Sequence, residues 1–359
     1  MRVLILSTHL NPGGISRYIL NLSSGLVKKG ITVFCASSGG LWAKDLENLG
    51  VKHKFIPIKT KSILSFKIIL SFFLLFPFIK KNKINLIHSN SRVTQFLGYL
   101  LYKFLNIPYI STFHGFYKKS IFRRLFKFSG LKTIAVSNSV KKHLIYDLGI
   151  NREKIKVVYN GIDLDKFFLK KNNKTSFGFK KDDFLIGILG RISEEKGHFL
   201  AVNAFLNLLN KYKNIYLLIC GKGRLENKLK RFIDENKIQN VKFVDLKGED
   251  FLDIIDLLLV PSKKEGFGYS VVEAFAKEVS VVAFNTGGIN EIIKDRENGV
   301  LFYDYSSYSL ERAIDLVISD GFLREKIINS AKEYVKKFSI ENMATNTLNI
   351  YKEVLNEKN

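Results

Sequence analysis

The sequence contains little cysteine and no obvious segment for export. Only two cysteines occur among the 359 residues, Cys35 and Cys220, and each lies inside an apolar run, where a thiol usually acts as a small hydrophobic group. This excludes a disulfide framework and fits the reducing cytosol. The first ten residues, MRVLILSTHL, form a strand-like run without a cleavage site, unlike a signal peptide.

Acidic residues are absent over a long stretch of the first half. None occurs between Glu47 and Asp147, whereas residues 48–146 contain 18 lysines and arginines. Residues 251–359 contain 13 basic and 17 acidic side chains, so the net charge of +24 belongs mainly to the first half. A bias in genome composition would affect both halves, and therefore a local anionic partner explains the asymmetry better.

Apolar runs bounded by Gly, Asn or Pro alternate with helix-length stretches along the chain. The runs are RVLILS, ITVFCAS, NLIHSN, IPYIST, LKTIAVS and IKVVYN, then FLIGILG, IYLLICG, VKFVD, DLLLVPS and SVVAFN. Such strands predict parallel sheets with helices on both faces, and the chain length favours two domains. We therefore predict an α/β fold with two doubly wound, Rossmann-like domains at 1–168 and 169–339, divided by a lysine-rich linker at 167–183.

Two carboxylates, Glu265 and Glu273, lie on either side of a glycine turn that leads into a predicted helix. Gly266 and Gly268 allow the backbone to bend close to a ligand, and carboxylates accept hydrogen bonds from the vicinal hydroxyls of a sugar or a ribose. The alternative is a solvated loop acid and a helix acid that is stabilised by the helix dipole. Spacing alone leaves both interpretations open.

The loop after FLIGILG contains two cations that suit a diphosphate. Arg191 would bind it bidentately, and Lys196 would act as a point charge. The alternative is that both are surface cations paired with Glu194 and Glu195.

Glycines mark two further loops. Gly13 and Gly14 follow the first predicted strand and precede a helix N-terminus, where backbone N–H groups hold anions. Gly221 and Gly223 form only half of a dinucleotide fingerprint, which does not identify an NAD site.

Taken together, these loops resemble the family 4 glycosyltransferases, retaining enzymes of the GT-B fold that move a sugar from a nucleotide donor. The resemblance covers nearly the whole chain and rests, in order, on NPGG, TFHG, AVSNSV, YNGIDLDKF, GRISEEKG, GKG, DLLLVPS, EGFGYSVVEAFA and NTGGINEII. It implies two Rossmann-like domains whose parallel sheets face each other across a cleft. The first domain would bind the acceptor and the second the nucleotide sugar, and a C-terminal helix at 340–359 would pack back on the first.

The resemblance also implies roles for individual residues. Arg191 and Lys196 would clamp the donor diphosphate, and Glu273 would hold the ribose hydroxyls. Glu265 would bind hydroxyls of the transferred sugar, and His114 in TFHG would stand beside the reacting sugar. The remaining residues of the donor site would be Gly13, Gly14, Gly221, Gly266, Phe267 and Gly268.

Histidine 114 is one of six histidines, and a lone histidine is usually just a satisfied polar residue. Its position distinguishes it, because His114 follows the strand-like run IPYIST, at the end of a strand where ligands bind in doubly wound sheets. We therefore prefer a functional role for His114.

The family is thought to react by front-face attack, in which the donor's own phosphate helps to deprotonate the acceptor. Catalysis would then be mainly electrostatic, with Arg191 and Lys196 stabilising charge on the departing diphosphate. We expect no metal ion and no cofactor beyond the nucleotide-sugar substrate. Asp163 and Asp165 spell a D-x-D, but in this family the matching segment has no metal role, and we reject it as a metal site.

Two segments of the basic half mix Phe, Leu and Ile with Lys and Arg, at residues 59–83 and 116–132. The apolar core at 68–79 has 12 residues and is too short to span a bilayer; it forms either a helix on a membrane surface or a buried helix. Five of the six cations in 116–132 are too many to bury and predict an exposed basic face: Lys118, Lys119, Arg123, Arg124 and Lys127.

These features predict a cytoplasmic enzyme on the inner face of the plasma membrane, with a lipid-linked or glycan acceptor and an anionic membrane surface as partners. The alternatives are a sugar-nucleotide epimerase of the GT-B fold and a basic nucleic-acid-binding protein. No motif for reading RNA or DNA accompanies the positive charge, so we expect no nucleic-acid partner. Neither the sugar nor its nucleotide, UDP or GDP, is legible in the sequence.

Overall fold

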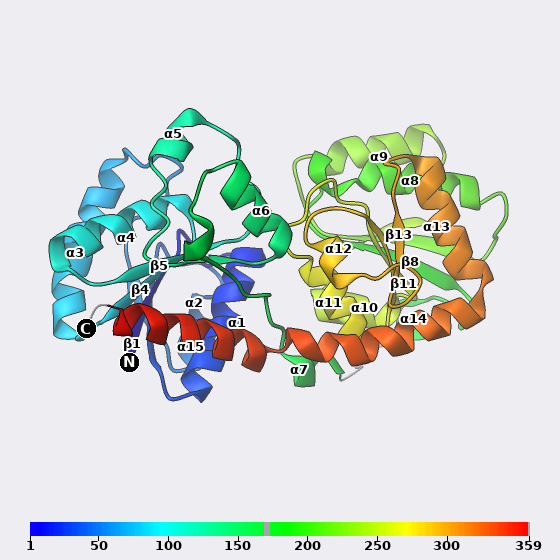
Figure 1. Ribbon diagram of the computed structural model, residues 1–359. Helices are drawn as coiled ribbons and strands as arrows, with labels where there is room; N and C mark the ends of the chain where they lie inside the picture. The colour runs from blue at the N-terminus through cyan, green and yellow to red at the C-terminus, as the bar shows by residue number, and fades with distance from the viewer. Residues whose placement is uncertain (169–172, 358–359) are drawn as a thin grey trace. The chain divides into compact units, whose positions relative to one another are not determined.

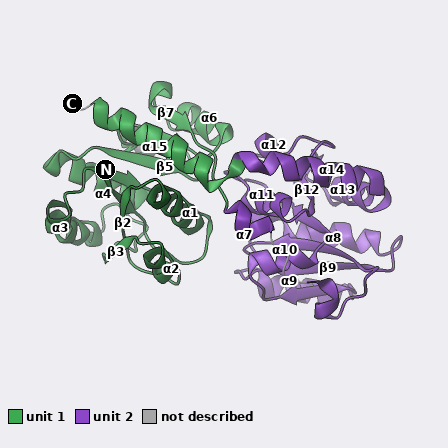
Figure 2. Ribbon diagram, turned by 90° about the horizontal axis from the view of Figure 1, so that it is seen from below, with its two compact units in different colours: residues 1–162, 338–359 green, residues 163–337 purple. Residues whose placement is uncertain are grey.

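A computed structural model describes residues 1–168 and 173–357 and, within them, every side chain except that of Phe122. The chain forms two compact units (Figures 1 and 2). The first contains Met1–Ile162 together with Phe338–Asn359, and the second contains Asp163–Lys337. The sequence had placed the two divisions at residues 169 and 340, a few residues later in each case.

The first unit is built around a parallel sheet with the strand order β3-β2-β1-β4-β5-β6-β7. Its strands are β1 (Arg2–Leu6), β2 (Thr32–Ser37), β3 (Lys52–Phe55), β4 (Leu86–Ser89), β5 (Tyr109–Phe113), β6 (Thr133–Ala135) and β7 (Ile155–Val157). Its helices are α1 (Gly14–Lys28), α2 (Ala43–Asn48), α3 (Phe66–Lys81), α4 (Arg92–Leu105), α5 (Ile121–Leu125), α6 (Asn138–Tyr146) and α15 (Ile340–Asn356), with a 3-10 turn η1 (Arg152–Lys154).

The second unit is a parallel sheet with the order β10-β9-β8-β11-β12-β13. Its strands are β8 (Phe184–Leu189), β9 (Ile215–Cys220), β10 (Val241–Val244), β11 (Leu257–Val260), β12 (Ser280–Phe284) and β13 (Val300–Phe302). Its helices and 3-10 turns are α7 (Leu164–Phe168), η2 (Lys174–Phe177), η3 (Glu194–Lys196), α8 (His198–Leu208), α9 (Glu226–Glu235), α10 (Gly248–Ile254), α11 (Tyr269–Ala276), α12 (Ile289–Ile292), α13 (Ser307–Ser319), α14 (Gly321–Tyr334) and η4 (Val335–Phe338).

Both sheets confirm the predicted α/β architecture, because each apolar run named above contains a strand. The central strands are buried along nearly their whole length, as in β1 and β11, which explains why they are continuously apolar. Two strands were not predicted: β3, the edge strand KHKF, is largely polar, and β13 has only three residues.

The C-terminal helix α15 belongs to the first unit and packs against α1. Gly25 of α1 makes this close approach possible, since a Cβ there would lie only 2.6 Å from the Cβ of Ala344. A β-bridge between Ile162 and Ser339 joins the point where the chain leaves the first unit to the point where it returns to it.

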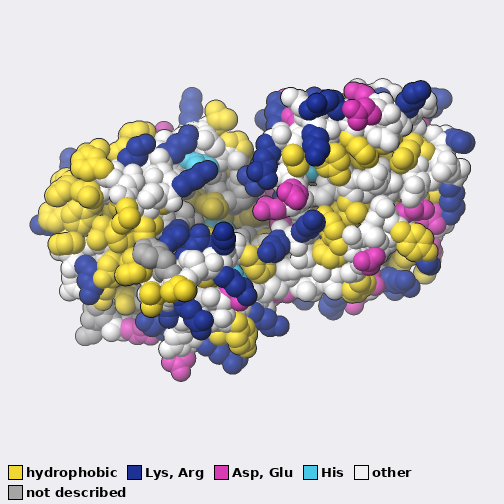
Figure 3. All heavy atoms as spheres, turned by 90° about the horizontal axis from the view of Figure 1, so that it is seen from above, with side chains coloured by type: hydrophobic (Ala, Val, Ile, Leu, Met, Phe, Trp, Pro, Cys, Tyr) yellow, Lys and Arg dark blue, Asp and Glu magenta, His cyan; other side chains and the backbone are white. Residues whose placement is uncertain are grey.

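The segment 59–83, for which the sequence left a membrane-surface helix and a buried helix open, contains the helix α3. Residues at helical spacing bury one face: Ile68, Ser71, Leu75 and Ile79. Its other face exposes large apolar side chains, including Phe66 at 72% and Phe73 at 65%. Figure 3 shows hydrophobic side chains gathered with Lys and Arg at the end of this unit that carries α3. One side of the helix is therefore buried, and the opposite side is exposed and also apolar. No described helix is long and apolar enough to cross a bilayer.

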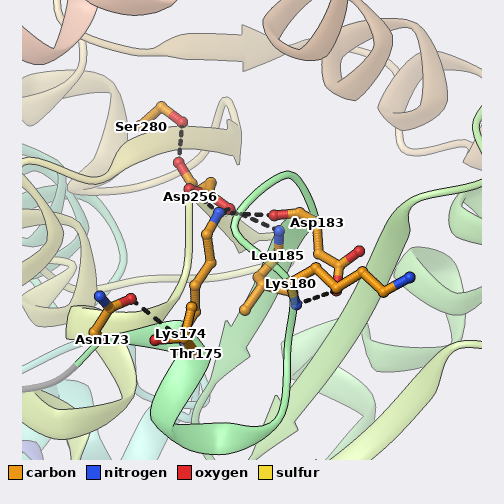
Figure 4. Close-up of polar contacts among 8 residues, drawn as sticks. All are labelled: Asn173, Lys174, Thr175, Lys180, Asp183, Leu185, Asp256 and Ser280. Carbon is orange, nitrogen blue, oxygen red and sulfur yellow. Dashed lines mark hydrogen bonds and ion pairs between the residues drawn. The ribbon is translucent and has the colours of Figure 1, made fainter.

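The predicted linker at 167–183 is wrong over residues 173–183, while residues 169–172 lie outside the described part of the chain. Lys174 Nζ reaches both carboxylate oxygens of Asp256 at 3.2 and 3.0 Å and the carbonyl oxygen of Asp183 at 2.7 Å (Figure 4). The Asp256 carboxylate also accepts a hydrogen bond from the backbone N–H of Leu185 at 2.8 Å. The ion pair between Lys174 and Asp256 therefore fixes this segment to the second unit.

The basic segment 116–132 contains α5, and four of its five named cations are exposed as predicted. Arg123 is half-buried and differs from the others.

Candidate functional site

The carboxyl ends of β8 and β11 form the point at which the strand order of the second sheet reverses. In doubly wound sheets, ligands bind in the crevice at this point. The loop after β8 carries Arg191 and Lys196, and the loop after β11 carries Glu265. The topology therefore collects these three predicted residues on one edge of one sheet.

Lys196 and Glu265 are in direct contact at this edge. The ammonium of Lys196 donates to Oε1 of Glu265, so among the described residues its partner is Glu265 and not the neighbouring Glu194 or Glu195. The Lys196 side chain is 31% exposed and the Glu265 side chain 15%, which leaves the pair accessible to a ligand. Both groups thus stand where one small molecule can touch an ammonium and a carboxylate.

Arg191 lies in the same loop as Lys196, and its side chain is exposed. The backbone around it is fixed to the next loop, because the N–H of Gly190 donates to the carbonyl oxygen of Cys220 at 2.9 Å. The Ile192 N–H donates to the carbonyl oxygen of Lys222 at 3.2 Å. The guanidinium is therefore carried by a rigid backbone and is free to turn toward a ligand.

Glycines allow the loops of this edge to touch backbone to backbone. A Cβ on Gly221 would lie 2.1 Å from the carbonyl oxygen of Gly190, and one on Gly223 would lie 2.1 Å from that of Ile192. Contact between loops thus explains both glycines of GKG without a dinucleotide, and the assignment of Gly221 to a donor site stays a prediction.

The loop after β11 is held in the same way. Gly197 has a left-handed φ of +72°, and a Cβ there would lie 2.2 Å from the carbonyl oxygen of Pro261. The N–H of Lys263 donates to the carbonyl oxygen of Glu195 at 2.8 Å, and the N–H of Gly288 donates to that of Glu265 at 2.8 Å. These contacts set the distance between the Lys196 loop and the Glu265 loop.

Glu273 lies on α11, which begins after Gly268 at a φ of +112°. Glu273 is 5% exposed, whereas the alternative of a solvated loop acid concerned Glu265, which is in contact with Lys196. The ring of Phe267 is also buried and packs edge-on against Tyr269. Any contact of residues 266–268 with a sugar would therefore use their backbone, as the resemblance implied.

In the first sheet the strand order reverses between β1 and β4. The loops there are tied together by Thr8 Oγ1 and Ser91 Oγ, 2.8 Å apart. Gly13 and Gly14 follow β1 at the start of α1, and the space where Gly13 would carry a Cβ is open. A ligand can therefore approach the backbone of this turn.

His114 follows β5 and lies beside the same point. Its Nε2 is 3.1 Å from Oδ1 of Asn90, and its ring stands edge-on to Tyr18 with centroids 4.7 Å apart. Burial lowers the pKa of His114 to about 3, so the imidazole is neutral at physiological pH. It can exchange hydrogen bonds with a sugar but does not present a positive charge.

A buried chain of hydrogen bonds stands behind His114, and sequence reasoning missed it. Tyr351 Oη lies 2.7 Å from Nδ1 of His88, and Nε2 of His88 lies 2.7 Å from Oγ1 of Thr112. Thr112 is in turn 3.1 Å from the hydroxyl of Tyr18, whose ring touches His114. The only local signal was a histidine at the end of an apolar strand, since Tyr351 lies 263 residues away.

Another histidine of the first unit, His143, has structural partners. His143 accepts the Tyr117 N–H at 3.0 Å and bonds Asp147 at 2.7 Å. Asp163 accepts the backbone N–H of Lys166, and Asp165 is exposed. Among the described residues, no group of three or more His, Cys, Asp or Glu side chains is placed to hold a metal ion.

Comparison with known families matches both units. Residues 12–166 match the model described as Glycosyltransferase Family 4, and residues 170–334 match Glycosyl transferases group 1. A glycosyltransferase of Methanocaldococcus jannaschii is 30% identical over 77% of each chain.

Two further relatives have more specific names. The Staphylococcus aureus capsular polysaccharide biosynthesis glycosyltransferase CapM is 29% identical over 88% of each chain. The Escherichia coli UDP-Gal:alpha-D-GlcNAc-diphosphoundecaprenol alpha-1,3-galactosyltransferase is 25% identical over 86% of this chain and 85% of the enzyme.

Solved structures share the fold. A glycosyltransferase of Rickettsia africae superposes with a TM-score of 0.87 at 26% identity, covering 99% of this chain and 98% of the other. HepE of Anabaena, solved in complex with UDP and glucose, gives 0.84 at 18% identity and covers 98% and 99%. The two parallel sheets thus form the GT-B fold.

Proposed function

Because the chain belongs to the family 4 glycosyltransferases, we propose that it transfers a sugar from a UDP- or GDP-sugar to a lipid-linked or glycan acceptor, with retention at the anomeric carbon. The observation that carries the donor half of this proposal is the contact between Lys196 and Glu265 at the switch point of the second sheet. It supports this half because an ammonium, which suits a diphosphate, lies beside a carboxylate, which suits sugar hydroxyls.

In this proposal the second unit binds the donor. Arg191 and Lys196 hold the diphosphate and stabilise the negative charge that grows on it as the glycosidic bond breaks. Glu265 accepts hydrogen bonds from sugar hydroxyls, with backbone N–H groups of residues 266–268 nearby. Glu273 anchors the ribose, and Gly221 keeps the neighbouring loop close.

The first unit supplies His114, held neutral by its burial. A neutral imidazole orients the reacting sugar through a hydrogen bond and does not repel or neutralise the donor phosphates. Gly13 and Gly14 offer backbone N–H groups to the donor diphosphate at the start of α1.

Retention without a protein nucleophile follows if the acceptor attacks on the face that the diphosphate leaves. The acceptor hydroxyl then gives its proton to a donor phosphate oxygen, the new glycosidic bond forms, and the nucleoside diphosphate departs. Positive side chains do the work that a divalent cation does in other transferases, so we propose a metal-independent reaction.

The names of the relatives support this choice of substrates. HepE was solved with UDP and glucose, and the Escherichia coli relative is a galactosyltransferase that uses UDP-Gal and a diphosphoundecaprenol-linked GlcNAc. Neither the epimerase nor the nucleic-acid-binding alternative is favoured by these relatives.

Donor binding can be tested by thermal stabilisation of the chain with a panel of UDP- and GDP-sugars. We expect one nucleotide sugar to raise the melting temperature, and Lys196→Met to weaken its binding at least about tenfold through loss of a charged contact. Lys264→Met removes an exposed lysine from the same edge and should leave binding unchanged. Equal binding by both variants would contradict the assignment of the donor site. Anomeric analysis of the product with and without a chelator tests retention and metal independence.

For the membrane, we propose peripheral attachment to the inner face of the plasma membrane through the exposed apolar side of α3 and the basic segment that contains α5. Phe66 and Phe73 project from α3, and lysines flank the helix at both ends. Apolar side chains beside cations suit an interface with anionic lipids.

Cosedimentation with anionic vesicles tests this attachment. Phe73→Asp should reduce the bound fraction severalfold, because it places a charge where an aromatic ring would enter the lipid. Phe322 is 82% exposed on α14 of the second unit, and Phe322→Asp is the matched control. Equal loss in both variants would contradict the choice of surface.

A further inference from the structure

A pocket in the first unit lies beside the His114 loop, because Phe113 and Tyr117 line it, but none of the steps above uses it. It is lined by residues from four places: the start of α4, the end of β5, the segment around α5, and the turn after α6. It is a small hollow that is partly open to solvent. The composition of its walls indicates a ligand.

Three cations contribute to the walls, namely Arg92, Arg123 and Lys127, and none of the described lining residues is acidic. Burial and the positive charge of Arg123 lower the pKa of Arg92, which shows that the two guanidinium groups lie close enough to repel each other. Arg123 is also the half-buried member of its otherwise exposed segment. An anion between these groups would remove their repulsion.

Gln95 adds an independent sign of a missing acceptor. Its side chain lines the pocket, is 2% exposed, and has an Nε2 without a hydrogen-bond partner among the described residues. A buried amide N–H that makes no hydrogen bond is costly, so native structures rarely leave one. An oxygen of an anion in the pocket would satisfy it.

The other walls are apolar or aromatic. Phe113, Leu148 and Ile150 are buried, and Phe126 and Tyr117 complete the lining. Leu125 of α5 is 71% exposed next to this rim. A small inorganic anion would leave these surfaces without a partner, whereas an anion attached to an apolar chain would cover them.

We propose that this pocket binds a phosphate or diphosphate group attached to an apolar chain, with the phosphate oxygens on Arg92, Arg123, Lys127 and Gln95. The chain leaves along Phe126 and the exposed side chains of α5. Such a ligand is the lipid-linked phosphate of an acceptor or the phosphate of a membrane lipid. The first of these two sources rests on the function proposed above, while the chemistry of the pocket does not.

Isothermal titration of the full chain tests the pocket with farnesyl diphosphate, dihexanoyl phosphatidylglycerol, inorganic pyrophosphate and farnesol. We expect at least one of the first two to bind at least tenfold more tightly than pyrophosphate and farnesol. A preference for farnesyl diphosphate identifies the prenyl-linked source, and a preference for the phospholipid identifies the membrane source. Binding of farnesol as tight as that of both phosphates would overturn the proposal.

Two variants locate the binding. Arg123→Gln and Gln95→Leu should each weaken it at least tenfold, and Gln95→Leu should retain the fold because it replaces an amide with an apolar group of similar size. Arg152→Gln removes an exposed guanidinium of the same unit outside the pocket and serves as the control. If Arg123→Gln and Gln95→Leu both bind like the wild type, the pocket is not the site.

The same protein variants distinguish a failure of the pocket proposal from a failure of the proposed donor site. Thermal stabilisation by a nucleotide sugar should be unchanged in Arg123→Gln. If farnesyl diphosphate binds in the pocket but no nucleotide sugar stabilises the chain, the proposed function is contradicted and the pocket proposal is supported. The opposite result would remove the pocket alone.

Discussion

The carboxyl edges of the two sheets share a topology but differ in chemistry. In each sheet the strand order reverses at one point, and the predicted site residues follow the strands there. The second edge carries a charged, accessible pair, Lys196 and Glu265. The first edge carries His114 and a buried chain of uncharged hydrogen-bonding groups behind it.

The two edges are made rigid by different mixtures of the same kinds of contact. Glycines without room for a Cβ let the loops of the second edge touch through their backbones, as at Gly197 and Gly223. The first edge also has such a contact, at Gly40 against the backbone of Leu10, and adds side-chain hydrogen bonds, as between Thr8 and Ser91. The site proposed for the diphosphate thus carries Arg191 as an exposed side chain on a fixed backbone, whereas the imidazole of His114 is itself fixed by its neighbours.

The largest loss of stability is expected from a substitution in the tightly packed loops of the second edge. Gly223→Ala places a Cβ about 2.1 Å from a backbone oxygen and should destabilise the second unit by about 2–3 kcal/mol. Circular dichroism follows both units, while the single tryptophan, Trp42, reports on the first. The variant should lower the transition seen by dichroism more than the one seen by Trp42 fluorescence.

Gly321→Ala is the control in the same unit, because the nearest atom to a Cβ there is the end of the Arg324 side chain at 3.9 Å. A loss of stability similar to that of Gly223→Ala would show that close contact between loops does not fix this edge.

The next prediction concerns how the stability of the first unit depends on pH. Burial lowers the pKa of His88 and of His114 to about 3, whereas an unfolded histidine titrates near 6.5. The unfolded chain therefore takes up protons first as the pH falls below 6.5, and the folded chain loses about 1.4 kcal/mol of stability per pH unit for each such histidine. This loss continues until the pH reaches the folded pKa.

Denaturant unfolding followed by Trp42 fluorescence between pH 4.5 and 7.5 measures that slope. His88→Asn should reduce the slope by the share of one histidine, and above pH 7 the difference from the wild type should become constant. An unchanged slope would mean that His88 is not held neutral by the fold.

The sequence was sufficient for the strands other than β3 and β13 and for the kind of residue at the second edge. Near-continuous apolar runs marked every buried central strand, and the loops after them held Arg191, Lys196 and Glu265. What could not be predicted are contacts between residues far apart in the chain. Lys196 meets Glu265 across 69 residues, and Lys174 meets Asp256 across 82.

The linker prediction failed for that reason. A stretch rich in lysine is typical of solvated chain, but Lys174 has a carboxylate partner that only the folded sheet supplies. The polar chain behind His114 was hidden in the same way, because Tyr18, His88 and Tyr351 come from α1, β4 and α15.

The smallest loss of stability is expected when one tyrosine hydroxyl is removed, and the two edges can be compared by removing one from each. Tyr351→Phe removes the partner of His88 Nδ1, 2.7 Å away in a fully buried site, and an unsatisfied buried nitrogen should cost about 1–3 kcal/mol. Tyr305→Phe removes a 3.1 Å bond to the Pro261 carbonyl at the second edge, where Tyr305 is only partly buried. Water can replace that donor, so we expect a loss below about 1 kcal/mol. Denaturant unfolding followed by circular dichroism, which reports on both units, should show a larger loss of stability for the first substitution than for the second. The reverse order would mean that the second edge depends on hydrogen bonds as the first does, and that its glycine contacts alone do not hold the loops.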